Sequence, residues 1–363
     1  MINSRCFLLL LSSVLLPGVV LAQPAGARGD NFIYRVLAGD TLSNIATTYT
    51  GKVQNWVTLQ TLNQVADTLA LPIGKELAIP FSLIPSHAST LAIIHRSGQV
   101  QVNGQTLATE ALTLNEGDRI QTGEQSSLSV KLHDNSVLLI PANSSLTVQR
   151  ARVFEGAPLS DTIVTLEDGD LESVVAPESP GVGRFEVRTP VSITGVRGTS
   201  LRVRHKAQVS VSEVLEGRAE LRTSTNTQYD QIPASYGASA SADKPGVTIS
   251  QLPQAPHITE PVRQGAQWTV QASAQPEVSS YLVQVARDAQ GTELLSRHTQ
   301  SGPALTFSAK RPGNHYVLIR SISEQGLMSA DTVAQFEGAS TLRTGDGGFI
   351  TTAFGDPVLV RDF

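Results

Sequence analysis

Residues 34–46 have the sequence YRVLAGDTLSNIA, and this stretch decides the fold of the first part of the chain. With the apolar residues just before it, it predicts a short strand over 32–36. A turn follows at 38–40, and Asp40 is the expected N-cap of the next helix. The apolar residues after the turn recur at helical spacing and predict a short helix: Leu42, Ile45, Ala46 and Tyr49.

Further along, the pattern predicts a second helix and a second strand. The helix is expected over 53–62, with Trp56, Leu59 and Leu62 on one face. A turn at 72–74 then leads to a strand over 77–80. The predicted order is β-α-α-β.

This stretch resembles a LysM module. The resemblance rests on Arg35-Val36, on 39–46, on Leu62-Asn63 and on 71–80, and it covers residues 31–80. One departure is Ile73, because that position is often proline, and here Pro72 stands one place earlier. The resemblance implies that two facing loops bind the N-acetylglucosamine units of peptidoglycan or of a related glycan. It assigns the following residues to glycan binding: Gly39, Asp40, Thr41, Leu42, Leu71 and Ile73.

Residues 1–22 are predicted to be a cleaved signal peptide. Arg5 precedes a short apolar run over 7–16, and Val20-Leu21-Ala22 places small residues before a cleavage site at Gln23. The run is shorter than the roughly 20 residues of a membrane-spanning helix. The single cysteine lies inside this segment. We therefore expect export to the periplasm or cell envelope, with no transmembrane segment and no cysteine in the mature chain.

Residues 91–250 are expected to form one β domain. Short alternating runs are separated by turn signals, which is typical of antiparallel strands. Turns are also expected at 114–118, 166–170 and 215–218. Residues 185–199, FEVRTPVSITGVRGT, resemble the signature of FecR-type periplasmic domains. Within that signature, the glycines that flank Arg197 favour a β-bulge over the alternative that Arg197 contacts an anion or a partner.

The remaining chain predicts a small β-sandwich over 257–337, followed by a tail over 338–363. The sandwich resembles a fibronectin-type domain, with strands expected at 267–271, 280–286, 304–307, 315–322 and 332–336. The predicted fold class is therefore mainly β and multidomain: a small βααβ module, an antiparallel β domain and a β-sandwich.

Composition and motifs argue against several function classes. The net charge of −5 gives no indication of nucleic-acid binding. The mature chain has no thiol nucleophile, and no two of its seven histidines lie within five residues of each other. His133-Asp134 is better explained by a hairpin turn than by a catalytic pair. We expect no catalytic residues, no metal site and no cofactor.

The leading hypothesis is a non-catalytic cell-envelope protein. Its LysM module would bind peptidoglycan, and its β domains would act as a scaffold or as a surface for an envelope protein. The alternative is a FecR-type envelope signal sensor or regulator. The best-known members of that family carry a cytoplasmic segment and a membrane helix before the FecR domain, where this sequence has a predicted signal peptide.

Overall fold

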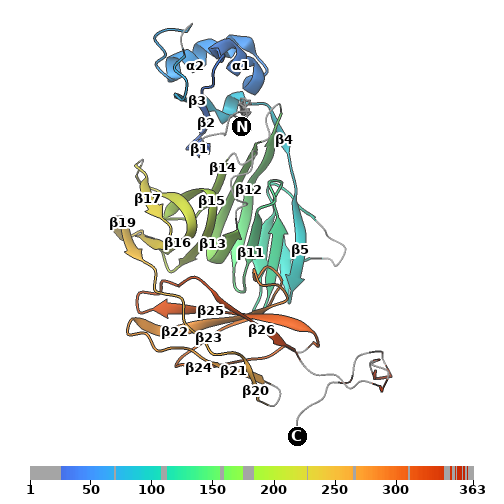
Figure 1. The fold of residues 1–363 in the computed structure, drawn as a ribbon. Helices are drawn as coiled ribbons and strands as arrows, with labels where there is room; N and C mark the ends of the chain where they lie inside the picture. Colours follow the sequence, from blue (N-terminus) through green and yellow to red (C-terminus); the bar gives the residue numbers. More distant parts are fainter. Residues whose placement is uncertain are drawn as a thin grey trace, which may run out of the picture.

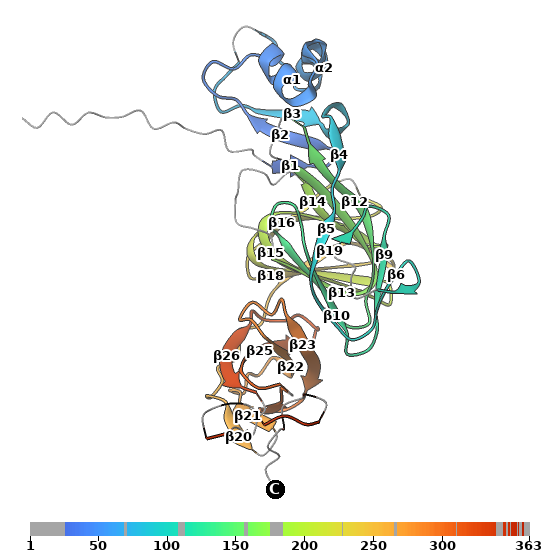
Figure 2. The ribbon, with the colours of Figure 1, turned by 90° about the vertical axis from the view of Figure 1, so that its right-hand side faces the viewer.

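The computed structural model describes residues 26–338, apart from 69–70, 108–112, 156–158, 175–183, 227, 265–266 and 310. It also describes scattered positions between 344 and 358. The predicted signal peptide and most of the predicted tail lie outside the described residues. Three parts follow one another along the molecule in chain order (Figures 1 and 2). The helices lie at one end, the long strands in the middle and the sandwich beyond them.

The first part has the predicted β-α-α-β order, with one more strand in front. Its three strands form an antiparallel sheet in the order β1-β2-β3. The elements are β1 (Gly26–Arg28), β2 (Asn31–Arg35), α1 (Leu42–Thr50), a 3-10 turn (Val53–Asn55), α2 (Trp56–Leu62) and β3 (Glu76–Pro80). Leu59 is fully buried, but Leu62 is 45% exposed, so the predicted apolar face of the second helix is wrong at that residue.

The core of this module continues into the middle domain. Phe154 and Leu159 are buried in the same apolar cluster as Leu42 and Leu77, and Phe154 stacks on Phe81 with ring centroids 5.2 Å apart. Residues 81–90, which lie between the two predicted domains, form a 3-10 turn (Phe81–Leu83) and strand β4 (Ser86–Ala88). Strand β4 pairs with β12, so this segment is part of the joint.

The middle domain is one curved 16-stranded sheet whose strands enclose a single apolar core. Its strands are β4, β5 (Leu91–Ser97), β6 (Val100–Val102), β7 (Gln105–Thr106), β8 (Thr113–Leu114), β9 (Arg119–Thr122), β10 (Ser127–Lys131), β11 (Val137–Ile140), β12 (Ser145–Phe154), β13 (Ser160–Val174), β14 (Arg184–Arg188), β15 (Ser192–Lys206), β16 (Val209–Thr223), β17 (Asp230–Pro233), β18 (Tyr236–Ser241) and β19 (Lys244–Gln251). The pairing is antiparallel, as predicted, except that β13 and β14 run parallel.

Two of the predicted turns in this domain are wrong. Strands β13 and β16 are 15 residues long and run through 166–170 and 215–218 without reversing. Gly169 and Gly217 have φ angles of 94° and 80°, so these glycines mark irregularities inside a strand rather than hairpins. The predicted bulge near Arg197 is confirmed, because the register of β15 against β16 shifts between Arg197 and Ser200.

The last part is a sandwich of two sheets, with strand orders β20-β21-β24 and β23-β22-β25-β26. The predicted strands are confirmed within two residues at each end, and two strands without a clear sequence signal, β20 and β23, complete the sheets. The bounds are β20 (Val262–Gln264), β21 (Gln267–Gln271), β22 (Val278–Ala286), β23 (Leu294–Gln300), β24 (Ala304–Phe307), β25 (Asn314–Ser323) and β26 (Thr332–Glu337).

The sandwich is joined to the middle domain by charged side chains that are largely buried. Both guanidinium η-nitrogens of Arg320 donate to the carboxylate of Glu172, at 2.8 and 2.7 Å, and Arg320 also pairs with Asp331. Burial alone would raise the pKa of Glu172, but Arg320, with smaller contributions from Arg297 and Arg202, lowers it to about 2. The joint therefore holds Glu172 as a carboxylate.

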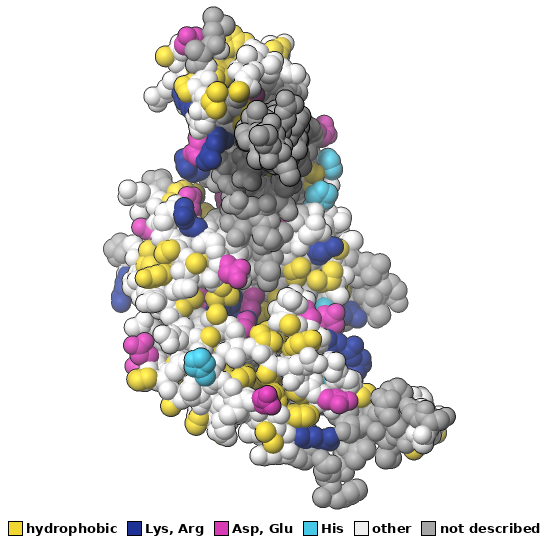
Figure 3. All heavy atoms as spheres, in the orientation of Figure 1, with side chains coloured by type: hydrophobic (Ala, Val, Ile, Leu, Met, Phe, Trp, Pro, Cys, Tyr) yellow, Lys and Arg dark blue, Asp and Glu magenta, His cyan; other side chains and the backbone are white. Residues whose placement is uncertain are grey.

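The surface of the molecule is lightly charged, as the composition indicates. On the face drawn in Figure 3, positive and negative side chains are scattered among polar and apolar ones. None of the described helices is long and apolar enough to cross a membrane.

Candidate functional site

The first predicted glycan loop connects β2 to α1, and Asp40 fixes its shape. One carboxylate oxygen of Asp40 accepts hydrogen bonds from the backbone N–H of Leu37 at 2.7 Å and from the Tyr34 hydroxyl at 2.6 Å. Burial, together with the bond to Asp40, raises the pKa of Tyr34. Gly39 has a φ of 89°, a left-handed backbone conformation that favours glycine, and the position that a Cβ would take faces open space.

The helix begins one residue later than the sequence indicates. Thr41 is extended, and its Oγ1 accepts a hydrogen bond from the N–H of Asn44 at 3.1 Å, so Thr41 is the N-cap. Asp40 is therefore not the cap, and its carboxylate instead accepts from Leu37 and Tyr34. In the described part of the chain, the N–H groups of Leu42 and Ser43 have no backbone or side-chain acceptor.

The second predicted glycan loop contains two of the predicted binding residues, Leu71 and Ile73, and they differ in exposure. Leu71 packs half-buried against the module core, whereas Ile73 is 71% exposed and offers an apolar surface to solvent. Leu42, from the first loop, is 1% exposed and belongs to the core. Leu42 can therefore meet a ligand through its backbone N–H but not through its side chain.

Hydrogen bonds to Val36 bring the two loops side by side. The carbonyl of Val36 accepts from Gly74 N–H at 2.8 Å, and its N–H donates to Lys75 at 2.9 Å. The structure thus places 39–42 and 71–73 at the same end of the small sheet. This end has helix-terminal N–H groups, the Thr41 hydroxyl at its edge and the exposed side chain of Ile73.

Asn63 positions the second loop, a role that was not predicted from the sequence. Its side-chain amide donates to the carbonyls of Leu59 and Ala78 and accepts from the N–H of Ala78 at 2.6 Å. These bonds tie the end of α2 to β3. The available signal was an Asn directly after the last helical residue, where a helix end commonly needs a polar partner.

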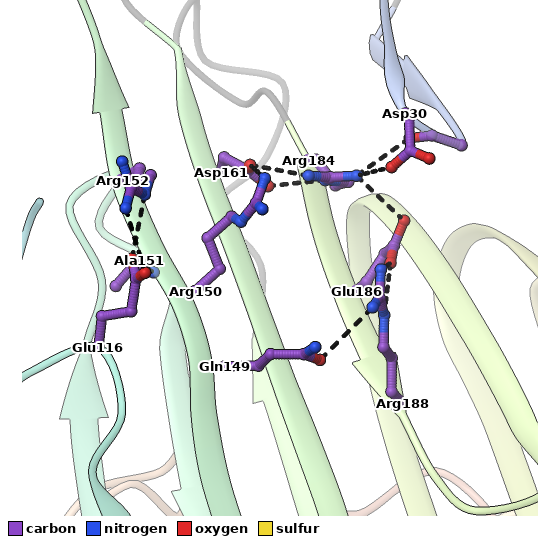
Figure 4. A network of polar contacts seen from close by, with 11 residues as sticks. Asp30, Glu116, Gln149, Arg150, Ala151, Arg152, Asp161, Arg184, Glu186 and Arg188 are labelled. Carbon is purple, nitrogen blue, oxygen red and sulfur yellow. Dashed lines mark hydrogen bonds and ion pairs between the residues drawn. The ribbon is translucent and has the colours of Figure 1, made fainter. Parts of the chain in front are cut away.

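A second polar site lies where the module meets the middle domain (Figure 4). Arg184, 3% exposed, donates to Asp161 of β13 at 2.6 and 2.8 Å and to Asp30 at 2.8 Å, and its guanidinium carbon lies 4.7 Å from the Phe81 ring centroid. Glu186 on the same strand pairs with Arg188 at 2.7 Å. Beside this network is a cleft of about 700 Å³. The sequence did not indicate this cleft, because its walls come from segments far apart in the chain.

The His133-Asp134 pair lies in a turn and not in a cluster of catalytic type. Asp134 accepts from the N–H of Ser136, and Asn135 has a φ of 68°, so His133-Asp134 stands in the hairpin turn between β10 and β11, as predicted. Among the described residues, no three His, Cys, Asp or Glu side chains gather as they would around a metal ion.

Comparison with known proteins identifies two domains in the chain. Residues 34–80 match the family model of the LysM domain, and residues 118–220 match that of the FecR protein family. No curated protein sequence matches the chain. The chain thus contains a LysM domain and a FecR domain, and both are typical of extracellular and periplasmic proteins.

Solved structures with some similarity include fibronectin-type and FecR-like proteins. One is a Parabacteroides distasonis ATCC 8503 protein assigned as an anti-sigma factor, with 16% identity, a TM-score of 0.30, and coverage of 37% of this chain and 59% of that one. Another comprises the FN1–FN3 domains of chicken CNTN1, with 10% identity, a TM-score of 0.22, and coverage of 70% and 99%. This chain therefore aligns with somewhat more than half of the first of these proteins.

Proposed function

We propose that this protein is a non-catalytic component of the cell envelope that binds peptidoglycan through its LysM domain. The observation that carries the proposal is the LysM match over 34–80, together with the adjacent placement of its two loops. LysM domains bind peptidoglycan and other N-acetylglucosamine glycans. The N–H groups of Leu42 and Ser43 suit the oxygen atoms of such a sugar, and the exposed Ile73 suits its acetyl methyl group.

The β domains act in this proposal as a scaffold that presents a partner-binding surface at a distance from the wall. The buried ion pairs of Arg320 and the shared core around Phe154 support this role, because they fix each neighbour to the middle domain. The predicted secretory signal before Gln23 gives the route to the periplasm. N-terminal sequencing of the exported protein should therefore begin near Gln23, and a retained Met1 would contradict that route.

Binding to purified peptidoglycan sacculi tests the proposal in the full chain. Isolated residues 31–80 are a poor probe, because cutting there removes Phe154 from the module core. Ile73→Asp places a charge on the proposed sugar surface, whereas Val57→Asp places one at another exposed position of the same domain, on α2. We expect Ile73→Asp to lose sedimentation with sacculi and Val57→Asp to retain it. Equal binding by both variants would contradict the site, and release of soluble muropeptides by the wild type would contradict the absence of catalysis.

Envelope signalling is the second candidate function, and the FecR match over 118–220 favours it. In that case the middle domain would recognise a regulatory protein rather than hold a partner passively. Deleting the gene should then change transcription of specific envelope genes, and the point variant Ile73→Asp should not reproduce that change. A transcript profile unaffected by the deletion would rule this role out.

A further inference from the structure

The cleft between the LysM domain and the FecR domain has features of a ligand site that the LysM loops do not supply. Its volume of about 700 Å³ lies within the usual range of small-ligand pockets. One wall is β1, which contributes Ala27 and Arg28, continued by Gly29 in the turn after it. The opposite wall is the part of β16 near Arg218 and Glu220. Arg184 and Phe185 of β14 also line it.

Strand β1 presents a free edge to this cleft. In the described part of the chain it pairs only with β2. Side chains alternate between the two faces of a strand, yet the consecutive strand residues Ala27 and Arg28 both line the cleft, as expected when a strand is met along its edge. A free strand edge carries unpaired N–H and C=O groups, which recruit an extended peptide by adding a strand. The backbone of this wall therefore suits a peptide.

The side chains of the cleft carry both charge signs. Arg218 is exposed, and within the described residues its guanidinium has no ion pair or hydrogen bond. Arg28, with its side chain 64% exposed, pairs with Glu76 at 3.6 Å. Glu220 faces the same space and is held by Gln231 at 2.6 Å. Such a lining complements a peptide that bears free carboxylates and an amino group.

The cleft also lies within reach of the proposed sugar site. Strand β2 separates the two, and its five residues span about 17 Å at about 3.4 Å per residue. Arg28 links the cleft to the LysM loops, because it lines the cleft and also contacts Glu76 at the start of β3, beside the second loop. An extended peptide of several residues, attached to a sugar in the loops, covers this distance.

We propose that this cleft binds the peptide stem that peptidoglycan carries on its sugar chain. The proposal rests on the proposed function, since it extends the same ligand from the LysM loops into the interdomain space. The backbone of the stem pairs with the edge of β1, its carboxylates meet Arg28 and Arg218, and its amino group meets Glu220. The protein would then distinguish stem-bearing glycan from bare glycan.

Calorimetric titration of the full mature chain tests this inference with three probes. They are the N-acetylglucosamine–N-acetylmuramic acid disaccharide carrying a tetrapeptide stem, the same disaccharide without peptide, and an uncharged acetyl-(Thr-Val)₃-amide peptide. We expect the stem-bearing sugar to bind about tenfold more tightly than the bare sugar, the factor that a single charge-assisted contact supplies. Arg218→Gln should remove this difference and leave binding of the bare sugar unchanged. Arg119→Gln, an exposed arginine of the same domain away from the cleft, should retain it.

The possible failures are distinguishable. Equal affinity for both sugars overturns the inference and leaves the proposed function intact. A stem preference that survives Arg218→Gln and Arg28→Gln also overturns it, because the stem would then bind elsewhere. If the uncharged peptide binds as tightly as the stem-bearing sugar, the edge accepts a protein strand instead. If neither sugar binds, the proposed function fails and the inference fails with it.

Discussion

The FecR domain meets the LysM domain through aromatic packing and meets the sandwich through buried charge. At the first joint, Phe154 stacks on Phe81, and the crossing ion pair joins buried Arg184 to Asp30, whose side chain is 94% exposed. At the second joint, the side chains of Arg320 and Glu172 are 5% and 13% exposed, and both come from strands. The two joints thus place their charges in very different surroundings.

This difference has an energetic consequence. Removing one partner of a buried ion pair is strongly destabilising, because the other charge then stays buried without compensation. An ion pair with one exposed partner is screened by water and contributes little. We therefore expect the sandwich joint to be sensitive to the loss of one charge, and the LysM joint to be sensitive to the loss of packing.

The largest effect is expected from Arg320→Ala. This change leaves the largely buried carboxylate of Glu172 and the half-buried carboxylate of Asp331 without their main partner, and it should lower the free energy of unfolding by about 3–5 kcal/mol. Urea denaturation of the full chain measures it. Arg287→Ala, at an exposed position of the same domain, should change stability by about 0.5 kcal/mol or less. Equal losses in the two variants would show that the buried charges do not hold the joint.

Phe154→Ala should have a comparable or slightly smaller effect at the other joint. It removes the ring that stacks on Phe81 and opens the shared core, at a cost of about 3 kcal/mol. Limited proteolysis should then cut near residues 81–90 first, because β4 loses its support. Val262→Ala, at a residue 58% exposed in the sandwich, provides the control. Cleavage confined to the sandwich would contradict the assignment of Phe154 to this joint.

Acid should weaken the sandwich joint through Glu172. Its pKa in the folded protein, about 2, lies below the ordinary value of 4.5, so the folded state holds the proton less tightly than the unfolded state. The stabilisation is then complete above about pH 4.5 and is lost as the pH falls toward 2. The difference in unfolding free energy between wild type and Glu172→Gln should shrink over that window. For Glu124→Gln, at an exposed position, the difference should stay small and flat.

The smallest effect is expected from Asp30→Asn. Because Asp30 is almost fully exposed and Arg184 keeps its two bonds to Asp161, the loss should be about 1 kcal/mol or less. Asp161→Asn, at a side chain 1% exposed, should cost clearly more in the same denaturation experiment. If Asp30→Asn destabilised the protein as much as Arg320→Ala, the contrast between the two joints would disappear.

The sequence predicted well what depends on local patterns. The strands at 267–271 and 304–307 were predicted with their final bounds, since alternation and turn residues are visible within a few positions. Asp40 was misassigned as the helix cap because Asp and Thr both suit that position, and only the bond from Tyr34 decides between them.

Long-range arrangements were not predictable in the same way. Gly169 and Gly217 resemble turn signals, and only the pairing of β13 with β15 and of β15 with β16 shows that the strands continue past them. Arg320 and Glu172 are 148 residues apart, and no local pattern indicates that they meet. The cleft beside β1 shares this property, since Arg28 and Arg218 come from different domains. Of the candidate site, the sequence thus supplied the LysM loops but not Asn63 or the cleft.

Strand β13 is connected to both joints of the FecR domain. Asp161 near its start binds Arg184, which in turn contacts Asp30 of the LysM domain, and Glu172 near its end binds Arg320 of the sandwich. If the wall holds the LysM domain and a partner pulls on the sandwich, tension that enters through β4 and β12 is shared with β13, which pairs with β12 along its length and carries Glu172 at the sandwich joint. The hydrogen bonds that join it to β12 and β15 are then loaded together in shear rather than opened one after another. The middle domain would then transmit force between its two neighbours, and the force would enter and leave at the ends of its strands.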